Sequence, residues 1–227
     1  MKVKRGLLAP AYKRGYNVLK DNGVVVVAMS IGNSYFIKEK IEELLNFLND
    51  NFSQVKLLIA DAISEHTYKA IGYKENKARR KSRLGANLFR NNCIRTIQGI
   101  RSAGKKVNIE IIDWYNKIEH NSEYEKQLFL IHDLYLNNKD FKKEADKTTR
   151  AVLLNKIKKG VKLSEAINEG VMYLIEELAF VLASPRIFGV KTTAYVYHRE
   201  WPVYVNLIDG KYDGVIRKDT AFIQLSD

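Results

Sequence analysis

Three short apolar runs in the first half of the chain predict buried strands. The first, Val24–Met29 (VVVVAM), is apolar on both of the faces that a strand would present, and it ends at Ser30. Such a run is typical of a strand that helices cover on both sides. Residues 55–60 (VKLLIA) and 107–112 (VNIEII) have a similar character, so we expect them to be strands of the same sheet.

Segments with helical periodicity separate these runs. Residues 34–49 place apolar side chains every three or four positions. A long basic segment, residues 77–102, does the same and ends before Gly104, a residue type that is favoured directly after a helix. Strands that alternate with helices are typical of an α/β fold. We therefore expect a single Rossmann-type domain over residues 1–227, with a mostly parallel central sheet flanked by helices.

The second half of the chain predicts three more helices and two late strands. The expected helices are 121–136, 142–159 and 164–183, and the expected strands are 193–198 and 203–208. The third helix is apolar almost all round, which indicates burial on most sides. Ser164 is a favourable N-cap for it, and Ser184-Pro185 is expected to stop it.

The charge of the chain is uneven. Thirty-eight Lys and Arg residues against 26 Asp and Glu residues give a net charge of +12. Within residues 74–106, eleven basic residues stand against one acid, Glu75, so eleven minus one leaves +10 in this segment alone. A surface with charges of one sign attracts polyanions such as nucleic acid.

As a helix, the basic segment would have an apolar back and a cationic front. Phe89, Cys93, Ile97 and Ile100 fall on one stripe that is suited to packing on a sheet. The residues expected to meet phosphates are Lys77, Arg79, Arg80, Lys81, Arg83 and Arg90. Charge alone leaves RNA, DNA and an anionic membrane surface open. No membrane span is expected, because no apolar run approaches the ~20 residues that one needs.

The sequence has no motif for a metal or a nucleotide cofactor. The four histidines (His66, His120, His132 and His198) lack metal-ligand spacing, and the single cysteine has no partner. Neither GxGxxG nor GxxxxGK[ST] occurs. We therefore expect no metal and no cofactor. One cysteine and an N-terminus without an apolar leader fit a cytoplasmic protein.

Ser30 is the first candidate for chemistry. It follows an apolar run at the carboxyl end of a predicted parallel strand, where ligands bind in open α/β sheets. Two interpretations stay open. The hydroxyl of Ser30 can act as a nucleophile beside the first N–H groups of the next helix, or Ser30 and Asn33 can merely cap that helix.

Two more groups of polar side chains are candidates. Tyr173 and Glu177 are four residues apart on the apolar helix and share one face, whereas Glu176 takes the wetter side. The Glu177 carboxylate either forms a structural ion pair, or it binds a substrate ammonium and acts as a base. Tyr197 and His198 end a late strand and point to opposite faces, so one can line a site while the other braces the loop.

Together these residues resemble the tRNA-dependent cyclodipeptide synthase family, which is related to the catalytic domains of class I tyrosyl- and tryptophanyl-tRNA synthetases. The matching residues are Ser30 and Asn33 in MSIGNSYF, Tyr173 and Glu177 in YLIEE, and Tyr197 and His198 in YVYHREWP. Asn, Tyr and His at these positions mark the NYH branch of the family. Ala28 departs from the glycine that members often carry there, which would narrow the pocket for the first aminoacyl group. The synthetase signatures HIGH and KMSKS are absent, so no activation by ATP is expected.

The resemblance implies a ping-pong reaction on two aminoacyl-tRNAs. Ser30 would become an aminoacyl-enzyme, and the amine of the second aminoacyl-tRNA would attack it to give a dipeptidyl-enzyme that closes into a cyclic dipeptide. Tyr173 and Glu177 would hold the substrate α-ammonium, with Glu177 taking its proton. Tyr197 would relay a proton, and Asn33 and His198 would position the intermediate. The basic helix would dock tRNA.

The expected product is cyclo(Leu-Leu), made from Leu-tRNA. A pocket lined by residues 24–28, Ile111 and the helix after Tyr173 would suit an apolar side chain. Mixed products are also expected, because apolar pockets discriminate a methylene group by only ~1–3 kcal/mol. Two rival hypotheses remain: another synthetase-like enzyme that uses tRNA, and a non-catalytic tRNA-binding protein in which Ser30 is only a cap.

Overall fold

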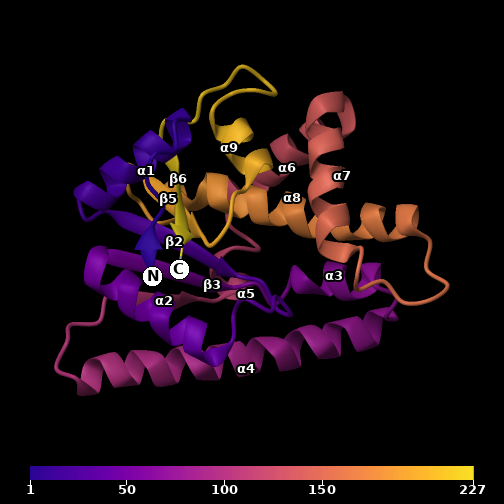
Figure 1. The fold of residues 1–227 in the computed structure, drawn as a ribbon. Helices are drawn as coiled ribbons and strands as arrows, with labels where there is room; N and C mark the ends of the chain where they lie inside the picture. The colour runs from indigo at the N-terminus through magenta and orange to yellow at the C-terminus, as the bar shows by residue number, and fades with distance from the viewer. Residues whose placement is uncertain (227) are drawn as a thin grey trace.

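The computed structural model describes residues 1–226, and its centre is a six-stranded sheet with helices on both faces (Figure 1). The strands are β1 (Lys2–Val3), β2 (Val24–Met29), β3 (Gln54–Ile59), β4 (Ile109–Ile112), β5 (Thr193–Tyr197) and β6 (Thr220–Ser226). The helices are α1 (Pro10–Lys20), α2 (Lys38–Asn51), α3 (Ser64–Ala70), α4 (Glu75–Ser102), α5 (Trp114–Lys117), α6 (Ser122–Asn137), α7 (Lys139–Leu153), α8 (Leu163–Ile187) and α9 (Pro202–Ile208). None of these described helices is long and apolar enough to cross a bilayer.

The strand order, β1-β6-β5-β2-β3-β4, makes β2 the point at which the chain changes direction across the sheet. From β2 the chain proceeds to β3 and β4 on one side, and it returns to place β5 and β6 on the other. All of these neighbours are parallel, and only the short β1 runs antiparallel to β6. The predicted α/β fold with a mostly parallel sheet is therefore confirmed. In such sheets the crevice beside the change of direction is the usual ligand site.

The two faces of the sheet belong to two cores. Val26 and Ala28 pack with α6, α8 and α9, whereas Val25 and Val27 pack with α2 and α4. In Figure 1, α2 and α4 lie below the sheet and α6 to α9 lie above it. All six residues of β2 are buried, as the continuous apolar run predicts.

Helix α8 passes through the centre of the upper layer, and its ends differ from the prediction. Its N-cap is Lys162 rather than Ser164, and the helix continues to Ile187 with Pro185 inside it. A proline cannot donate a hydrogen bond to the carbonyl four residues earlier. The Ser184 hydroxyl donates to that carbonyl, Val181 O, at 2.7 Å instead. This substitute bond is one reason why Pro185 does not end the helix.

The predicted strand at 203–208 is wrong, because this segment is helix α9. Pro202 occupies the first turn of α9, where its missing N–H costs nothing, and the buried run that follows fits a helix as well as a strand. Helix α7 also differs from the predicted 142–159. It begins after Asn138, whose side chain accepts hydrogen bonds from the N–H groups of Asp140 and Phe141, and it ends at Leu153.

Helix α4 approaches the loop after β2 so closely that a glycine is required there. A Cβ at Gly85 would lie 2.3 Å from Cγ2 of Ile31, the buried residue directly after Ser30. By contrast, Gly99 near the other end of α4 has open space around the same position. The contact at Gly85 therefore sets the separation between α4 and the Ser30 loop.

We predict opposite effects for Gly85→Ala and Gly99→Ala on the midpoint of thermal unfolding. Gly99→Ala should stabilise the protein by about 0.5–1 kcal/mol, because alanine restricts the unfolded chain and favours a helix. Gly85→Ala gains the same propensity but must displace Ile31, so its midpoint should fall below that of the wild type. Equal stabilisation by both variants would show that Ile31 yields without cost.

Candidate active site

Ser30 lies at the carboxyl end of β2 and faces α8. Successive side chains of a strand alternate, so Val26, Ala28 and Ser30 share the face that packs on α8. The Ser30 hydroxyl forms a hydrogen bond of 2.7 Å with the Tyr173 hydroxyl of α8. This bond joins the candidate nucleophile to a residue 143 positions later in the sequence.

The interpretation of Ser30 and Asn33 as helix caps is wrong. Helix α2 begins only at Lys38, its N-cap is Ile37, and no side chain caps it. Asn33 has another role, in which its Oδ1 accepts from the N–H of Tyr35 at 3.1 Å. Its Nδ2 donates to the Tyr197 hydroxyl at 3.3 Å. Asn33 therefore links the Ser30 loop to the end of β5.

Glu177 is a buried carboxyl group, 6% exposed, one turn beyond Tyr173 on α8. The Tyr195 hydroxyl donates to its Oε1 at 3.1 Å. Burial raises the pKa of Glu177 to about 7, against the opposing effects of the Tyr195 and Tyr173 hydroxyls and of the Arg199 charge. In the described part of the chain no Lys or Arg forms an ion pair with Glu177, so the interpretation as a structural ion pair is not supported.

Ser30, Tyr173, Glu177 and Tyr195 thus form a continuous polar row inside an apolar core. Burial raises the pKa of both tyrosines well above 10, and the nearby Glu177 carboxylate raises it further, so both tyrosines remain protonated donors. A row of this kind can hold an ammonium group next to the serine and accept its proton at Glu177. A base whose pKa is close to the working pH is suited to that transfer.

Tyr195 was not identified as a site residue from the sequence. It lies two positions before Tyr197 on β5, and this spacing puts both side chains on one face of the strand. That spacing was the available signal, but a tyrosine in a buried strand is usually a packing residue. Only the position of Glu177 on α8 reveals its function as a hydrogen-bond donor.

Tyr197 and His198 do not point to opposite faces as predicted, because their ring centroids lie only 4.3 Å apart. His198 follows the last residue of β5, so the alternation of side chains along a strand no longer applies to it. The Tyr197 side chain is on the Glu177 side, where it accepts from Asn33, and its pKa is raised by burial and by the Glu177 charge. The His198 ring stacks on the Tyr35 ring, with centroids 3.8 Å apart and planes 6° apart, and it meets Phe36 edge-on. His198 therefore braces the loop that follows Ser30, while Tyr197 lines the site.

A charged cluster on a neighbouring face of α8 holds this helix against α3. His66 contacts Glu169 through Nδ1 at 2.8 Å and Glu176 through Nε2 at 3.0 Å, and Lys69 adds a contact of 2.8 Å to Glu169. Burial lowers the pKa of His66, but the hydrogen bonds with the two carboxylates outweigh it and the net shift is upward. Glu176 is on the wetter side of α8, as expected, and is occupied by this contact.

Helix α4 has the predicted apolar back and cationic front. Phe89, Cys93 and Ile100 are buried against the sheet and α2. On the front, Lys77, Arg80 and Arg83 are exposed. The other three residues predicted to contact tRNA are Arg79, Lys81 and Arg90, and each has a partner within the protein.

These partners divide the cations of α4 into two groups. Arg79 lies 3.3 Å from Glu65 and 3.4 Å from Glu75, and Arg90 lies 3.8 Å from Asp61. The Lys81 ammonium is 4.8 Å above the ring of Tyr73, which Lys77 also approaches at 5.6 Å. Arg80 and Arg83 form no ion pair within residues 1–226, so their charges remain directed to solvent.

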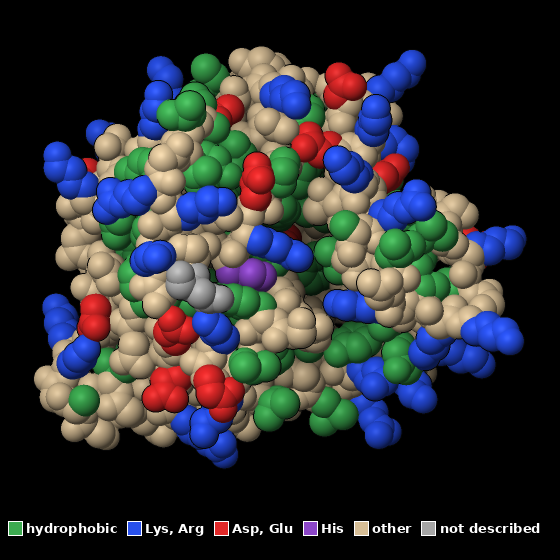
Figure 2. All heavy atoms as spheres, in the orientation of Figure 1, with side chains coloured by type: hydrophobic (Ala, Val, Ile, Leu, Met, Phe, Trp, Pro, Cys, Tyr) green, Lys and Arg blue, Asp and Glu red, His purple; other side chains and the backbone are tan. Residues whose placement is uncertain are grey.

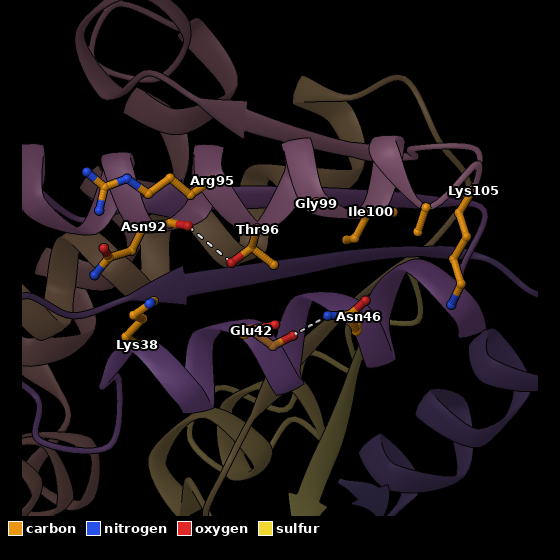
Figure 3. Close-up of a pocket in the computed structure, with 10 residues that line it drawn as sticks. Lys38, Glu42, Asn46, Asn92, Arg95, Thr96, Gly99, Ile100 and Lys105 are labelled. Carbon is orange, nitrogen blue, oxygen red and sulfur yellow. Dashed lines mark hydrogen bonds between the residues drawn. The ribbon is translucent and has the colours of Figure 1, made fainter.

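A groove of about 370 Å3 lies between α2 and the second half of α4 (Figure 3). Lys38, Arg95 and Lys105 give it a cationic rim, and Glu42 lies on the α2 wall together with Lys38. The groove is separate from the Ser30 region, because its described lining comes from α2, α4 and the turn after α4. We therefore place the candidate active site at Ser30 rather than in this groove.

The family model for cyclodipeptide synthases matches residues 8–225. The chain belongs to the cyclodipeptide synthase family. The match covers all the residues discussed above, and the resemblance inferred from the sequence is confirmed. Within residues 1–226, no three His, Cys, Asp or Glu side chains gather in a way that could hold a metal ion.

Two relatives of this chain within the cyclodipeptide synthase family align with most of it. The cyclo(L-leucyl-L-leucyl) synthase of Staphylococcus haemolyticus is 22% identical over 89% of this chain and 87% of its own length. The cyclo(L-tyrosyl-L-tyrosyl) synthase of Mycobacterium tuberculosis is 23% identical over 88% of this chain and 69% of its own. A solved Mycobacterium tuberculosis structure, described as relating cyclodipeptide synthetases to type I tRNA synthetases, superposes with a TM-score of 0.76 at 18% identity, over 98% of this chain and 96% of that one.

We predict that Glu177→Gln stabilises this cyclodipeptide synthase family member above pH 7. The folded protein binds the Glu177 proton more tightly than the unfolded chain does, since folding raises the pKa of this carboxyl from its ordinary value of 4.5 to about 7. Folding stability should therefore fall as the pH rises from 4.5 to 7, by up to about 3 kcal/mol. Glutamine has no charge to bury, so urea unfolding should show the variant to be more stable at pH 8 and nearly equal to wild type at pH 4.5.

Glu176→Gln, at the position before Glu177 on α8, is the matched control. Its carboxylate contacts His66 at 3.0 Å, so removing the charge should destabilise the protein at pH 6, where His66 is protonated. Destabilisation by Glu177→Gln of the same size at pH 4.5 and pH 8 would contradict the raised pKa of Glu177.

Proposed function

We propose that this protein joins the aminoacyl groups of two aminoacyl-tRNAs into a cyclic dipeptide, with Ser30 as the nucleophile. The observation that carries the proposal is the polar row from Ser30 through Tyr173 to the buried Glu177, at the crevice beside β2. The exposed cations of α4 supply the electrostatic attraction that a tRNA substrate requires. An aminoacyl-tRNA ester is already activated, so the reaction needs no ATP.

In the first step the Ser30 oxygen attacks the ester carbonyl of one aminoacyl-tRNA. A bond forms between Oγ and the carbonyl carbon, the bond to the ribose oxygen breaks, and the serine proton ends on that ribose hydroxyl. The Tyr173 hydroxyl, 2.7 Å from Oγ, orients the nucleophile. Tyr173 and Glu177 hold the α-ammonium group of the amino acid, which would otherwise be placed in an apolar core without a partner.

Atom balance sets the direction of the second step and corrects the one expected from the sequence. If the amine of the second aminoacyl-tRNA attacked the acyl-serine, the dipeptide would leave on tRNA. For the dipeptide to remain on Ser30, the amine of the serine-bound group must attack the ester of the second aminoacyl-tRNA. Glu177 is placed to remove the proton from this first amine, and its pKa of about 7 allows it to do so near neutral pH.

In the last step the free amine of the dipeptide attacks the seryl ester and releases the ring. The new amide bond replaces the bond to Oγ, and Ser30 regains its proton. We assign the proton relay to Tyr197, which is on the same face of β5 as Tyr195 and is hydrogen-bonded to Asn33. Asn33 and His198 hold the loop that carries Ser30, the former through Tyr197 and the latter by stacking on Tyr35.

We propose cyclo(Leu-Leu) as the product. The name of the Staphylococcus haemolyticus relative supports it, as does the apolar surface around Ala28 and α8. The expected pocket needs a correction: Val25, Val27 and Ile111 pack on the other face of the sheet, so they do not contribute to the α8 side. The β4 residue that packs on the α8 side is Ile112, which pairs with Leu58 of β3, the partner of Ala28.

We predict that Ser30→Ala abolishes formation of the cyclic dipeptide from a pool of aminoacyl-tRNAs, measured by mass spectrometry. Wild-type protein incubated with Leu-tRNA should also gain the mass of one leucyl group or one dipeptidyl group, and the variant should gain neither. Ser34→Ala, an exposed serine of the same loop, is the control and should retain both signals. Product formation by Ser30→Ala would remove Ser30 as the nucleophile.

We predict that Arg80→Ala weakens tRNA binding more than Arg79→Ala does. Both variants remove one charge from α4, but Arg79 is neutralised in part by Glu65 and Glu75. Removing one interaction with a phosphate should lower the slope of log affinity against log salt by about 1. Titrations of labelled tRNA between low and moderate salt would measure this slope, and equal weakening by the two variants would show that the ion pairs of Arg79 open on binding.

A further inference from the structure

The loop between α7 and α8 (residues 154–162) connects the basic helix to the nucleophile loop. Its Lys158 ammonium lies 3.0 Å from the centre of the Tyr73 ring, near the start of α4, and 3.4 Å from Gly72 O. Its Lys156 ammonium lies 3.5 Å from the carbonyl of Gly32, two residues beyond Ser30. One loop therefore places a cation at each end of the path from α4 to Ser30.

Arg199 stands on the other side of the same opening. It follows β5, and its guanidinium carbon lies 5.7 Å from the centre of the Tyr197 ring. Its charge opposes the upward shift in the pKa of both Tyr197 and Glu177. Arg199 is thus close to the polar row, although its side chain is exposed.

Lys156 and Arg199 border the same segment: Lys156 contacts Gly32 O, and Arg199 lies over the ring of Tyr197, to which the neighbouring Asn33 side chain donates a hydrogen bond. Partial removal from water lowers the pKa of Lys156, and the Arg199 charge lowers it further. Within residues 1–226 neither side chain forms an ion pair. Both side chains are exposed, and an anion bound between them would relieve the repulsion of the two like charges.

We propose that Lys156 and Arg199 form a seat for the 5′-phosphate of the terminal nucleotide of the aminoacyl-tRNA. The inference rests on the proposed function, which places the ester of that nucleotide at Ser30. The amino acid has no free carboxylate in this ester, so the anion nearest to the reacting carbonyl is this phosphate, one ribose away. The two residues are positioning residues, because they act on the phosphate and not on the reacting atoms.

The cations before this seat form a track that leads to it. Lys77, Lys81 and Lys158 surround the ring of Tyr73 at the start of α4, and Lys156 follows on the same loop as Lys158. Figure 2 shows basic side chains gathered at the end of the molecule where this loop and the start of α4 lie, and a hollow in the middle of the same face with basic side chains on its rim. Phosphates bound in succession would direct the acceptor end of the tRNA toward Ser30.

Two small esters that differ only in this phosphate test the seat. The probes are adenosine and adenosine 5′-monophosphate, each with a leucyl ester on the ribose, and the readout is kcat/KM for acylation of Ser30, followed by intact-protein mass. For the wild type the phosphorylated ester should react with a kcat/KM roughly tenfold to hundredfold higher, as expected for charge-assisted hydrogen bonds to one phosphate. In Lys156→Ala and Arg199→Ala the ratio between the two esters should fall toward one, mainly through KM.

Two further variants separate recognition of the phosphate from a general effect of charge or structure. Lys156→Arg keeps the cation and should restore most of the ratio. Lys162→Ala, on the same loop, makes the same change in net charge, but Lys162 is paired with Glu165 on the surface at 3.4 Å, so the ratio should stay at its wild-type value. Equal loss on both esters in Lys156→Ala, or an unchanged ratio, would overturn the seat.

The outcomes also separate the seat from the function on which it rests. If wild-type protein acquires no acyl group from either ester and makes no cyclic dipeptide from aminoacyl-tRNAs, the proposed function fails and the seat fails with it. If wild-type protein is acylated but its rate is the same for the two esters, the function stands and the seat alone is refuted.

Discussion

The site depends on the parallel pairing of β2 with β5, two strands that are distant in the chain. Val24 to Val26 pair with Thr193 to Tyr195, and beyond these pairs the two strands lead to Ser30 and Tyr197. Because side chains alternate along each strand, this register turns Ser30 toward the same face as Tyr195 and Tyr197. A shift of one residue on either strand would direct Ser30 or the tyrosines toward α2 and α4, away from Glu177. The register is held by the apolar residues of both strands, which are buried on both sides.

The buried Glu177 carboxyl is an unfavourable feature of the fold that the proposed reaction would use. Two tyrosine hydroxyls and the Arg199 charge reduce the cost of its ionisation without removing it, and the remaining cost appears as a pKa of about 7. An ion pair with Lys or Arg would have stabilised the carboxylate more, but it would also have lowered the pKa and occupied the position that a substrate ammonium needs. The polar row thus gives up stability for a group that can both bind an ammonium and take its proton.

The sequence predicted the structure best where a pattern of apolar residues fits only one kind of secondary structure. The run of β2 and the two faces of α4 were predictable, and the spacing of Tyr173 and Glu177 placed both on one face of α8. Prediction failed where a pattern fits two structures, as in α9, or where a side chain compensates for a breaker, as Ser184 does for Pro185. It also failed where only tertiary structure gives a residue its role. Tyr195 donates to Glu177 of α8, and Lys156 contacts Gly32 O beside Ser30, and local sequence reveals neither contact.

The internal contacts of α4 show why net charge overstates the surface available to RNA. Arg90 lies near Asp61 at the end of β3, and Ser82 donates a hydrogen bond to the carbonyl of the same residue, so part of the basic face anchors the helix beside the site. Burial raises the pKa of Asp61, and the Arg90 charge opposes that rise, which identifies Arg90 as the counter-charge of a half-buried acid. Removing Arg90 would therefore disturb the position of α4 as well as its charge. A charge-removal experiment on this helix tests RNA binding only at positions such as Arg80 and Arg83, whose side chains are exposed and have no such structural task.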